Sequence, residues 1–231
     1  AASSLTANSL SFTNSSTSLT LSPGINFGTS AFTVETYFKT GPVFDSAFLL
    51  GVGGGNGLSI NLHSANEIQL DGYGINSTVF VLASPISLSA WHHIAVVRDA
   101  NNNETVWVDG VRAVSSYNRW NTSLTYGPIF VDSRNYNGST TGINKSDACA
   151  HCNQPVDRDF NGAKISNFRV VLGSALYDPN SATITPPSVP LANVTNTKLL
   201  LNVAASSTFL TDSSGIQTVT NSGTPVTYSA S

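Results

Sequence analysis

Short runs of alternating apolar and polar residues, separated by turn formers, extend from Ser9 to Thr220. In the clearest run, Phe32–Lys39, apolar residues and Thr36 occupy the even positions, and Thr33, Glu35, Tyr37 and Lys39 occupy the odd positions. A period of two places these sets on opposite faces of a strand. The single place for a helical turn is Ser174–Tyr177. The pattern therefore predicts an all-β chain, either a sandwich or a barrel.

Two longer predicted strands are Trp91–Arg98, which is apolar on both faces, and Glu104–Val108. Asp109-Gly110 follows the second of these and predicts a type I′ hairpin turn, with Val111–Ser115 as the return strand. The other predicted strands are Ser9–Phe12, Ser18–Leu21, Ala47–Val52, Leu58–Leu62, Ile68–Asp71, Val79–Ala83, Ile129–Val131, Ala163–Leu172, Lys198–Val203 and Gln217–Thr220.

Charged residues make up 10% of the 231 residues, and the net charge is −3. Globular chains usually have about 25% charged residues. Without a surplus of cations the chain is not expected to bind nucleic acid. No apolar run approaches the length of a membrane-spanning helix, about 18 residues. The absence of Met indicates a processed or excised chain, and no composition break divides it, so we expect one domain over residues 1–231.

Several segments resemble the laminin-G-like, concanavalin A-like jelly rolls, including the copies found in virion proteins of marine phages and large algal viruses. The resemblance covers most of residues 9–203, and it implies an antiparallel β-sandwich jelly roll. The fold hosts lectins, glycanases, adhesion modules and structural virion parts, so it implies no single function. Thr211–Gly215 is similar to the linker between tandem copies, so residues 204–231 are a closing strand or an inter-repeat linker. The matching segments are Ser9–Phe12, Phe32–Lys39, Trp91–Arg98, Val106–Val111, Phe160–Val170, Gly173–Tyr177 and Thr185–Pro187.

Catalytic residues are not expected. Retaining glycanases need two carboxyl groups about 5–5.5 Å apart, but Glu35 has no acidic neighbour on its own strand face. Asp157 and Asp159 have a suitable spacing, yet they lie in a predicted loop beside Arg158. Solvated loop charges are the simpler interpretation of this pair.

Metal sites receive little support from the sequence. Laminin-G-like domains often bind calcium at a rim of the sandwich, and the loop acids available for such a site are Asp132, Asp157 and Asp159. They form no dedicated calcium motif, so we expect no cofactor and keep calcium as the alternative. His92 and His93 lie in a predicted strand, where burial in the sheet is a better interpretation than metal ligation.

The two cysteines, Cys149 and Cys152, lie in one polar loop. In an oxidising compartment they predict a local disulfide, and a redox or zinc site lacks the helix or the second ligand pair that it needs. Asn-X-Ser/Thr sequons also occur, either by chance or as glycan acceptors in a secretory setting. The sequon asparagines are Asn14, Asn76, Asn103, Asn121, Asn137, Asn144 and Asn193.

The best candidate for ligand binding is an aromatic and amide cluster in irregular sequence. Sugars stack on exposed aromatic rings while amides and charged groups bind their hydroxyls. Within a binding site Trp120 would be the stacking platform, but the simpler interpretation is that it closes the end of the core, because large aromatic residues are mostly buried. The predicted contact residues are Tyr117, Asn118, Arg119, Trp120, Asn135 and Tyr136.

Three functions therefore compete at this point. The first is a non-catalytic recognition module that binds a cell-surface glycan or a neighbouring virion protein, on a virion or outside a cell. The second is a structural virion component such as a capsid, spike or fibre part. The third is a degenerate glycoside hydrolase, which the lack of a carboxylate pair disfavours. Self-association is expected for either of the first two.

Overall fold

A computed structural model describes residues 5–13, 17–42, 47–50, 58–72, 75–115, 126–129 and 162–230. These residues form seventeen strands and no helix, so Ser174–Tyr177 is not a helical turn. Within these ranges no helix is long and apolar enough to cross a membrane. The prediction of an all-β antiparallel fold is confirmed.

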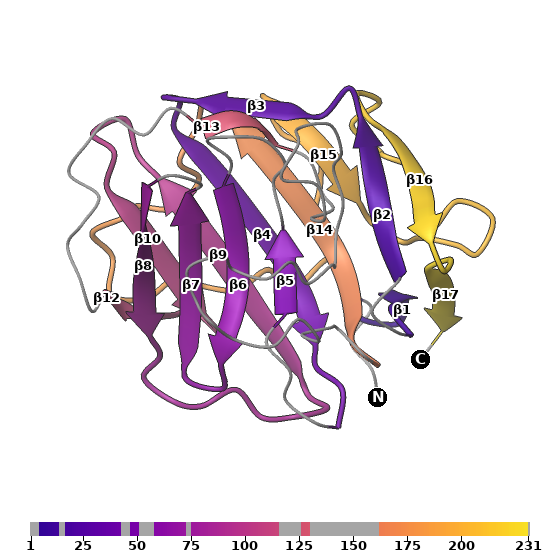
Figure 1. Cartoon of the computed structure of the whole chain (residues 1–231), viewed down its shortest axis with the longest axis horizontal. Helices are drawn as coiled ribbons and strands as arrows, with labels where there is room; N and C mark the ends of the chain where they lie inside the picture. Colours follow the sequence, from indigo (N-terminus) through magenta and orange to yellow (C-terminus); the bar gives the residue numbers. More distant parts are fainter. Residues whose placement is uncertain are drawn as a thin grey trace.

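The largest sheet has eight strands (Figure 1). All its pairs are antiparallel, and β15 pairs with β14 beside the main path. In spatial order the strands are β11 (Val111–Arg112), β10 (Glu104–Val108), β9 (Trp91–Arg98), β4 (Phe32–Lys39), β14 (Lys164–Leu172), β1 (Asn8–Ser11) and β17 (Thr227–Ala230), with β15 (Thr197–Leu201) off this path.

A five-stranded sheet lies in front of the large sheet in Figure 1. Its strands, in order, are β12 (Val114–Ser115), β8 (Ile75–Val81), β7 (Glu67–Gly72), β6 (Leu58–Ser64) and β5 (Ala47–Leu50). Two further pairs complete the fold: β3 (Ile25–Gly28) with β13 (Tyr126–Ile129), and β2 (Thr17–Ser22) with β16 (Thr218–Gly223).

The main core lies between the two large sheets. The even-numbered apolar residues of β4 and β9 belong to the same buried cluster as alternate residues of β6 and β7. Burial of these side chains provides the main driving force for folding, at roughly 25 cal/mol per Å² of apolar surface. The principal members are Phe32, Val34, Phe38, Ile94, Val96, Ile60, Leu62, Ile68 and Leu70.

Three sequence predictions coincide with observed strand bounds, namely those for β4, β9 and β10. The Asp109-Gly110 turn is also confirmed, because both residues have positive φ (50° and 81°) between paired β10 and β11. The predicted return strand Val111–Ser115 is instead divided. Its first half pairs with β10 in the large sheet and its second half pairs with β8 in the small sheet, so the chain changes sheets at Ala113.

Strand β14 contains a β-bulge next to β4. Ser166 lies opposite Tyr37 and Arg169 lies opposite Glu35, so three steps along β14 match two steps along β4. Asn167, with a φ of 54°, supplies the extra residue. Asparagine tolerates this left-handed conformation better than most residues. Its side chain donates to Leu5 O (2.7 Å) and accepts from Leu191 N (3.0 Å), which fixes the bulge in place.

The two ends of the described chain meet at one edge of the large sheet. Strands β1 and β17 pair antiparallel, with Asn8 opposite Ala230. The segment that joins β15 to β16 is held by Asp212, whose carboxylate accepts from the backbone N–H groups of Leu200, Ser214, Ile216 and Gln217. This single buried carboxylate therefore organises the turn before β16.

Candidate functional site

The segment that follows β14, residues 173–192, crosses the outer face of the eight-stranded sheet, and we call it the strap. Side chains of β4 and β10 donate hydrogen bonds to its backbone carbonyl groups, which are thereby satisfied without forming a strand. The donor and acceptor pairs are Thr33 with Ser174 (3.1 Å), Thr105 with Pro179 (3.1 Å), Trp107 with Ser181 (3.1 Å) and Tyr37 with Pro187 (2.5 Å).

A second, smaller apolar cluster lies between the strap and the sheet. Trp107 is fully buried there, and its indole lies 6.1 Å from the ring of Tyr177 (between centroids). Ala95 and Val97 of β9 complete the sheet side, and Ile184 packs from the strap side. The strap thus covers a face that would otherwise expose a large aromatic surface.

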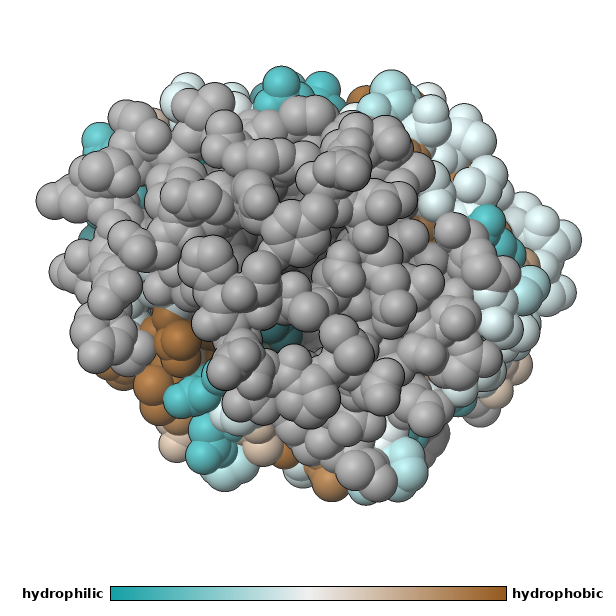
Figure 2. All heavy atoms as spheres, in the orientation of Figure 1, coloured by the Kyte–Doolittle hydropathy of each residue, from teal (hydrophilic) through white to brown (hydrophobic). Residues whose placement is uncertain are grey.

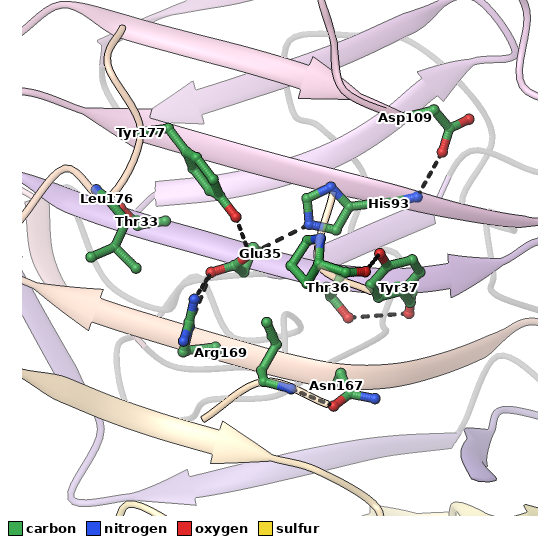
Figure 3. A network of polar contacts seen from close by, with 12 residues as sticks. Thr33, Glu35, Thr36, Tyr37, His93, Asp109, Asn167, Arg169, Leu176 and Tyr177 are labelled. Atoms are coloured by element: carbon green, nitrogen blue, oxygen red, sulfur yellow. Dashed lines mark hydrogen bonds and ion pairs between the residues drawn. The ribbon is translucent and has the colours of Figure 1, made fainter. Parts of the chain in front are cut away.

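Glu35 lies under the strap in the centre of a polar network (Figure 3). Its side chain is fully buried. Oε1 accepts from Nε of Arg169 (3.0 Å) and from Nη2 of the same guanidinium, and Oε2 accepts from the Tyr177 hydroxyl (2.8 Å). His93 Nε2 lies 3.4 Å from Oε2, which places the imidazole proton on Nε2. Both carboxylate oxygens therefore have structural partners.

Arg169 links this network to the end of the strap. Its Nη1 donates to Ala192 O at 2.8 Å, while Nε and Nη2 face Glu35. A buried carboxylate that loses its cation is left uncompensated, which typically costs about 3–5 kcal/mol. The Glu35–Arg169 ion pair thus connects β4 and β14 to the strap, and we call this pair the Glu35–Arg169 lock.

The charges in the network perturb nearby titrations. Burial opposes ionisation of Glu35, but the His93 hydrogen bond and the positive charge of Arg169 outweigh it and lower the Glu35 pKa. Burial, followed by the negative charge of Glu35, raises the pKa of Tyr37 to about 12. The same two causes raise the pKa of Tyr177. At neutral pH these shifts favour an ionised Glu35 and uncharged Tyr37 and Tyr177.

This arrangement cannot act as a glycosidase centre. The buried Glu35 carboxylate has no access to solvent and no lone pair free for a sugar. Neither β9 nor β14, the strands on both sides of β4, contains an aspartate or glutamate. Within β4, β9 and β14, all of which are described, Glu35 is thus a single carboxyl group without the second one that glycoside hydrolysis requires.

Most residues predicted from the sequence as site residues lie outside the described ranges. Two sequon asparagines are described and exposed: Asn193, which follows the strap, and Asn103, whose Nδ2 donates to Asp99. Asn76 lies in β8, and its side chain is outside the description. Also outside are Tyr117, Asn118, Arg119, Trp120, Asn135, Tyr136, Asp132, Asp157, Asp159, Cys149, Cys152, Asn14, Asn121, Asn137 and Asn144.

The strands on either side of the segment that contains Tyr117 and Trp120 are described, although the segment itself, residues 116–125, is not. We call residues 116–125 the aromatic segment. Residues 116–125 connect β12, at the edge of the five-stranded sheet, to β13, which pairs with β3. The two flanking strands thus belong to different sheets. The ligand cluster predicted from the sequence starts where the chain leaves the small sheet.

The partners of Glu35 could not be identified directly from the sequence. His93 and Arg169 are 58 and 134 residues away from it along the chain, and Tyr177 is 142 residues away. The sequence does, however, contain an indication that these two residues are paired. Glu35 and Arg169 are each the one charged residue in the interior of a strand whose other interior residues are apolar or neutral. Such residues are rarely buried unless they are paired.

Residues 13–145, more than half of the chain, match the sequence profile of the Laminin_G_3 family, described as the concanavalin A-like lectin/glucanase superfamily. The chain belongs to this superfamily. The match agrees with the resemblance noted in the sequence, and the sandwich of antiparallel sheets is the fold expected for a member. No curated protein matches the chain.

Among solved structures, similar folds occur in bacterial and animal proteins. A Bacteroides ovatus protein, described provisionally as carbohydrate-binding, shares 14% identity and a TM-score of 0.55 over 97% of this chain and 60% of its own length. A heptameric SAP-like pentraxin of Limulus polyphemus shares 12% identity and a TM-score of 0.53 over 96% and 97% of the two chains. This superfamily member thus spans less than two thirds of the Bacteroides protein, and these likenesses show the fold alone.

Proposed function

We propose that the chain is a non-catalytic carbohydrate-recognition module, displayed outside the cell or on a virion surface. The observation that carries the proposal is the state of Glu35. The superfamily includes both lectins and glucanases. In this chain the Glu35 carboxylate is buried and bound by Arg169 and Tyr177, which favours a role in stability over a role in hydrolysis. Binding without hydrolysis is the function that this arrangement favours.

The proposed binding surface combines the aromatic segment after β12 with Asn135 and Tyr136, which follow β13 in the sequence. Trp120 stacks on the apolar face of a sugar, Tyr117 and Tyr136 flank it, and Asn118, Arg119 and Asn135 bind hydroxyl groups. The small proportion of charged residues supports a neutral ligand, because few charges are available to attract an ionic one. The description of the Bacteroides ovatus protein also supports a carbohydrate as the ligand class.

Glycan-array binding by the full chain tests this proposal. We expect binding to a defined set of glycans without any release of reducing sugar. The Trp120→Ala variant should lose binding while its melting temperature stays within about 2 °C of the parent, the change expected for an exposed side chain. Val189→Ala, a change at an exposed residue of the strap, is the control and should bind as the parent does.

Two outcomes would contradict the proposal. A chain that binds no glycan and is found ordered in a repeating particle lattice is a structural component. A strongly destabilised Trp120→Ala variant that retains binding places Trp120 in the core and the ligand elsewhere. Light scattering of the same preparation tests the accompanying proposal of self-association, which a monomer at high concentration would refute.

A further inference from the structure

Three segments of the fold meet at the ring of His92, at the start of β9. His92 lies on the core face of the large sheet, beside the ring of Phe38 at 5.8 Å between centroids. The residues 82–90 approach it from one side, where they connect β8 in the small sheet to β9 in the large sheet. The β10–β11 turn approaches it from the other side through Asp109.

Both ring nitrogens of His92 face oxygen acceptors. Nδ1 lies 2.6 Å from Asp109 Oδ2, and Nε2 lies 3.0 Å from the carbonyl oxygen of Ser87. A carboxylate and a carbonyl oxygen both accept hydrogen bonds, and a neutral imidazole has a proton for only one of them. The Ser87 hydroxyl also lies 3.2 Å from Nε2, but it can donate or accept, whereas the carboxylate and the carbonyl can only accept. The two fixed acceptors therefore match an imidazolium, in which both nitrogens donate.

Each acceptor belongs to a segment that is anchored elsewhere. The 82–90 segment is fastened to the small sheet by the Ile86 N–H, which donates to Ala65 O at 2.7 Å. Asp109 also accepts from the backbone N–H of His93 (2.8 Å), and Gly110 O accepts from Ile184 N in the strap (2.9 Å). His92 thus joins the crossover between the sheets to the turn that supports the strap.

We propose that His92 is a pH-sensitive latch, which as an imidazolium holds residues 82–90 and the β10–β11 turn together and on deprotonation loosens both. The proposal is independent of the proposed function, because it concerns the end of the sandwich and not a ligand. With a neutral ring, one of the two hydrogen bonds is lost and the carboxylate of Asp109 loses its counter-charge.

Among the described residues, few charged or titratable groups surround the latch. From the turn, Asp109 faces Nδ1, and from the 82–90 segment only the carbonyl and hydroxyl of Ser87 face Nε2. Strand β4 presents the uncharged ring of Phe38. His93 and Tyr37 lie on the outer face, and each interacts electrostatically with the Asp109 carboxylate. The Asp109 hydrogen bond raises the pKa of His92, although burial opposes it, and the same contact lowers the pKa of Asp109 against its own burial.

The sign of the pH effect follows from these directions. A histidine with a raised pKa in the folded state stabilises that state fully below its unfolded pKa, about 6.5, and the contribution disappears as pH rises through the folded value. Asp109 behaves in the opposite way, since its contribution disappears as pH falls through its lowered folded pKa. The latch is closed between these two titrations, and it opens on the alkaline side when the pH rises through the raised pKa of His92.

Thermal unfolding of the full chain between about pH 5 and pH 9 tests the latch across the ordinary histidine pKa, about 6.5. The melting temperature should fall as pH rises through the folded pKa of His92, and the His92→Gln variant should lose this slope. His63→Gln is the matched control, because His63 is a partly exposed histidine beside Glu67, and it should keep the slope. An unchanged slope in His92→Gln would overturn the proposal.

Nitrogen chemical shifts of the histidine rings provide a second measurement that needs no stable variant. At a pH of about 6.5, the ordinary midpoint of a free histidine, both nitrogens of His92 should still have the shifts of protonated nitrogen. Amide hydrogen exchange in residues 82–90 and at Asp109 should then accelerate beyond its intrinsic pH dependence when the ring titrates. A His92 that titrates at or below the ordinary value, or exchange that does not change, would show that no latch exists.

Discussion

Arg169 lies directly opposite Glu35 because β14 has one more residue than β4 between two paired positions. Without the extra residue, counting from the Ser166–Tyr37 pair would bring Phe168 opposite Glu35. The bulge therefore exchanges an aromatic ring for a guanidinium on the outer face, and it leaves Phe168 in the main core. One residue of register decides whether the buried carboxylate has a partner.

Asn167, the residue at the bulge, should be sensitive to the type of substitution. Asn167→Ala removes hydrogen bonds to Leu5 and Leu191 and places a Cβ residue without a polar side chain at positive φ. We expect a loss of at least about 2 kcal/mol in the free energy of unfolding. Asn167→Gly removes the same hydrogen bonds but accepts the conformation, so it should cost about 1 kcal/mol less than Ala. Equal losses in urea unfolding would show that the backbone is not strained.

The Glu35–Arg169 lock can be tested by a double-mutant cycle. Glu35→Leu leaves the guanidinium buried without its carboxylate, and Arg169→Met leaves the carboxylate without its cation. Each single change should cost about 3–5 kcal/mol. The double variant should recover a large part of that loss, because neither charge remains. Additive losses in chemical denaturation would mean that the two residues act independently.

The β10–β11 turn provides a test with an internal control. A Cβ on Gly110 would lie 2.4 Å from Ile184 O, whereas a Cβ on Gly215 meets nothing within 4 Å. Both glycines have positive φ (81° and 74°), so the conformational cost is similar and only Gly110 adds a clash with the strap. Gly215→Ala should cost about 1–2 kcal/mol, and Gly110→Ala and Gly110→Val should cost more. If all variants lose equally, the strap does not press on the turn.

The sequence predicts the central strands well because their burial pattern is local. Phe32–Lys39, Trp91–Arg98 and Glu104–Val108 have the observed bounds, and the alternation within Phe32–Lys39 places its even-numbered apolar residues in the main core as expected. Asp109-Gly110 identifies its turn because only a few residue types accept positive φ at both positions. Both the strand pattern and the turn signal depend only on residues that are close together in the sequence.

The features that the sequence did not reveal depend on long-range contacts. Strands β3 and β17 have four residues each and are defined by distant partners, β13 and β1. The strap has no alternating pattern, because several of its carbonyl groups accept from side chains of the sheet and only a short part of it, around Thr183, pairs with β11. The register shift at Asn167 requires knowledge of both β4 and β14. The aromatic cluster around Trp120 stays a prediction, since it lies outside the described residues.

The tyrosines under the strap should make the protein sensitive to alkali. Burial and the charge of Glu35 raise the pKa of Tyr37 to about 12, above the ordinary value of 10.0. A group with a raised pKa contributes stability that is complete below its unfolded pKa and disappears as pH rises through the folded value. Stability should therefore decline between about pH 10 and pH 12, and the tyrosinate absorbance of Tyr37 and Tyr177 should appear together with unfolding.

Tyr177→Phe separates this effect from general alkaline denaturation. The variant loses the hydroxyl that donates to Glu35 at 2.8 Å, which should cost about 1.5–3 kcal/mol at neutral pH, as for a hydrogen bond to a charged group. Because Tyr177 no longer ionises, the further loss above pH 10 should be smaller than in the parent. Tyr228→Phe, which removes a hydroxyl bonded to Asn8 and remote from Glu35, is the control and should leave the alkaline slope unchanged. A Tyr177→Phe variant as stable as the parent at neutral pH, with the same alkaline slope, would show that this hydroxyl does not secure the strap.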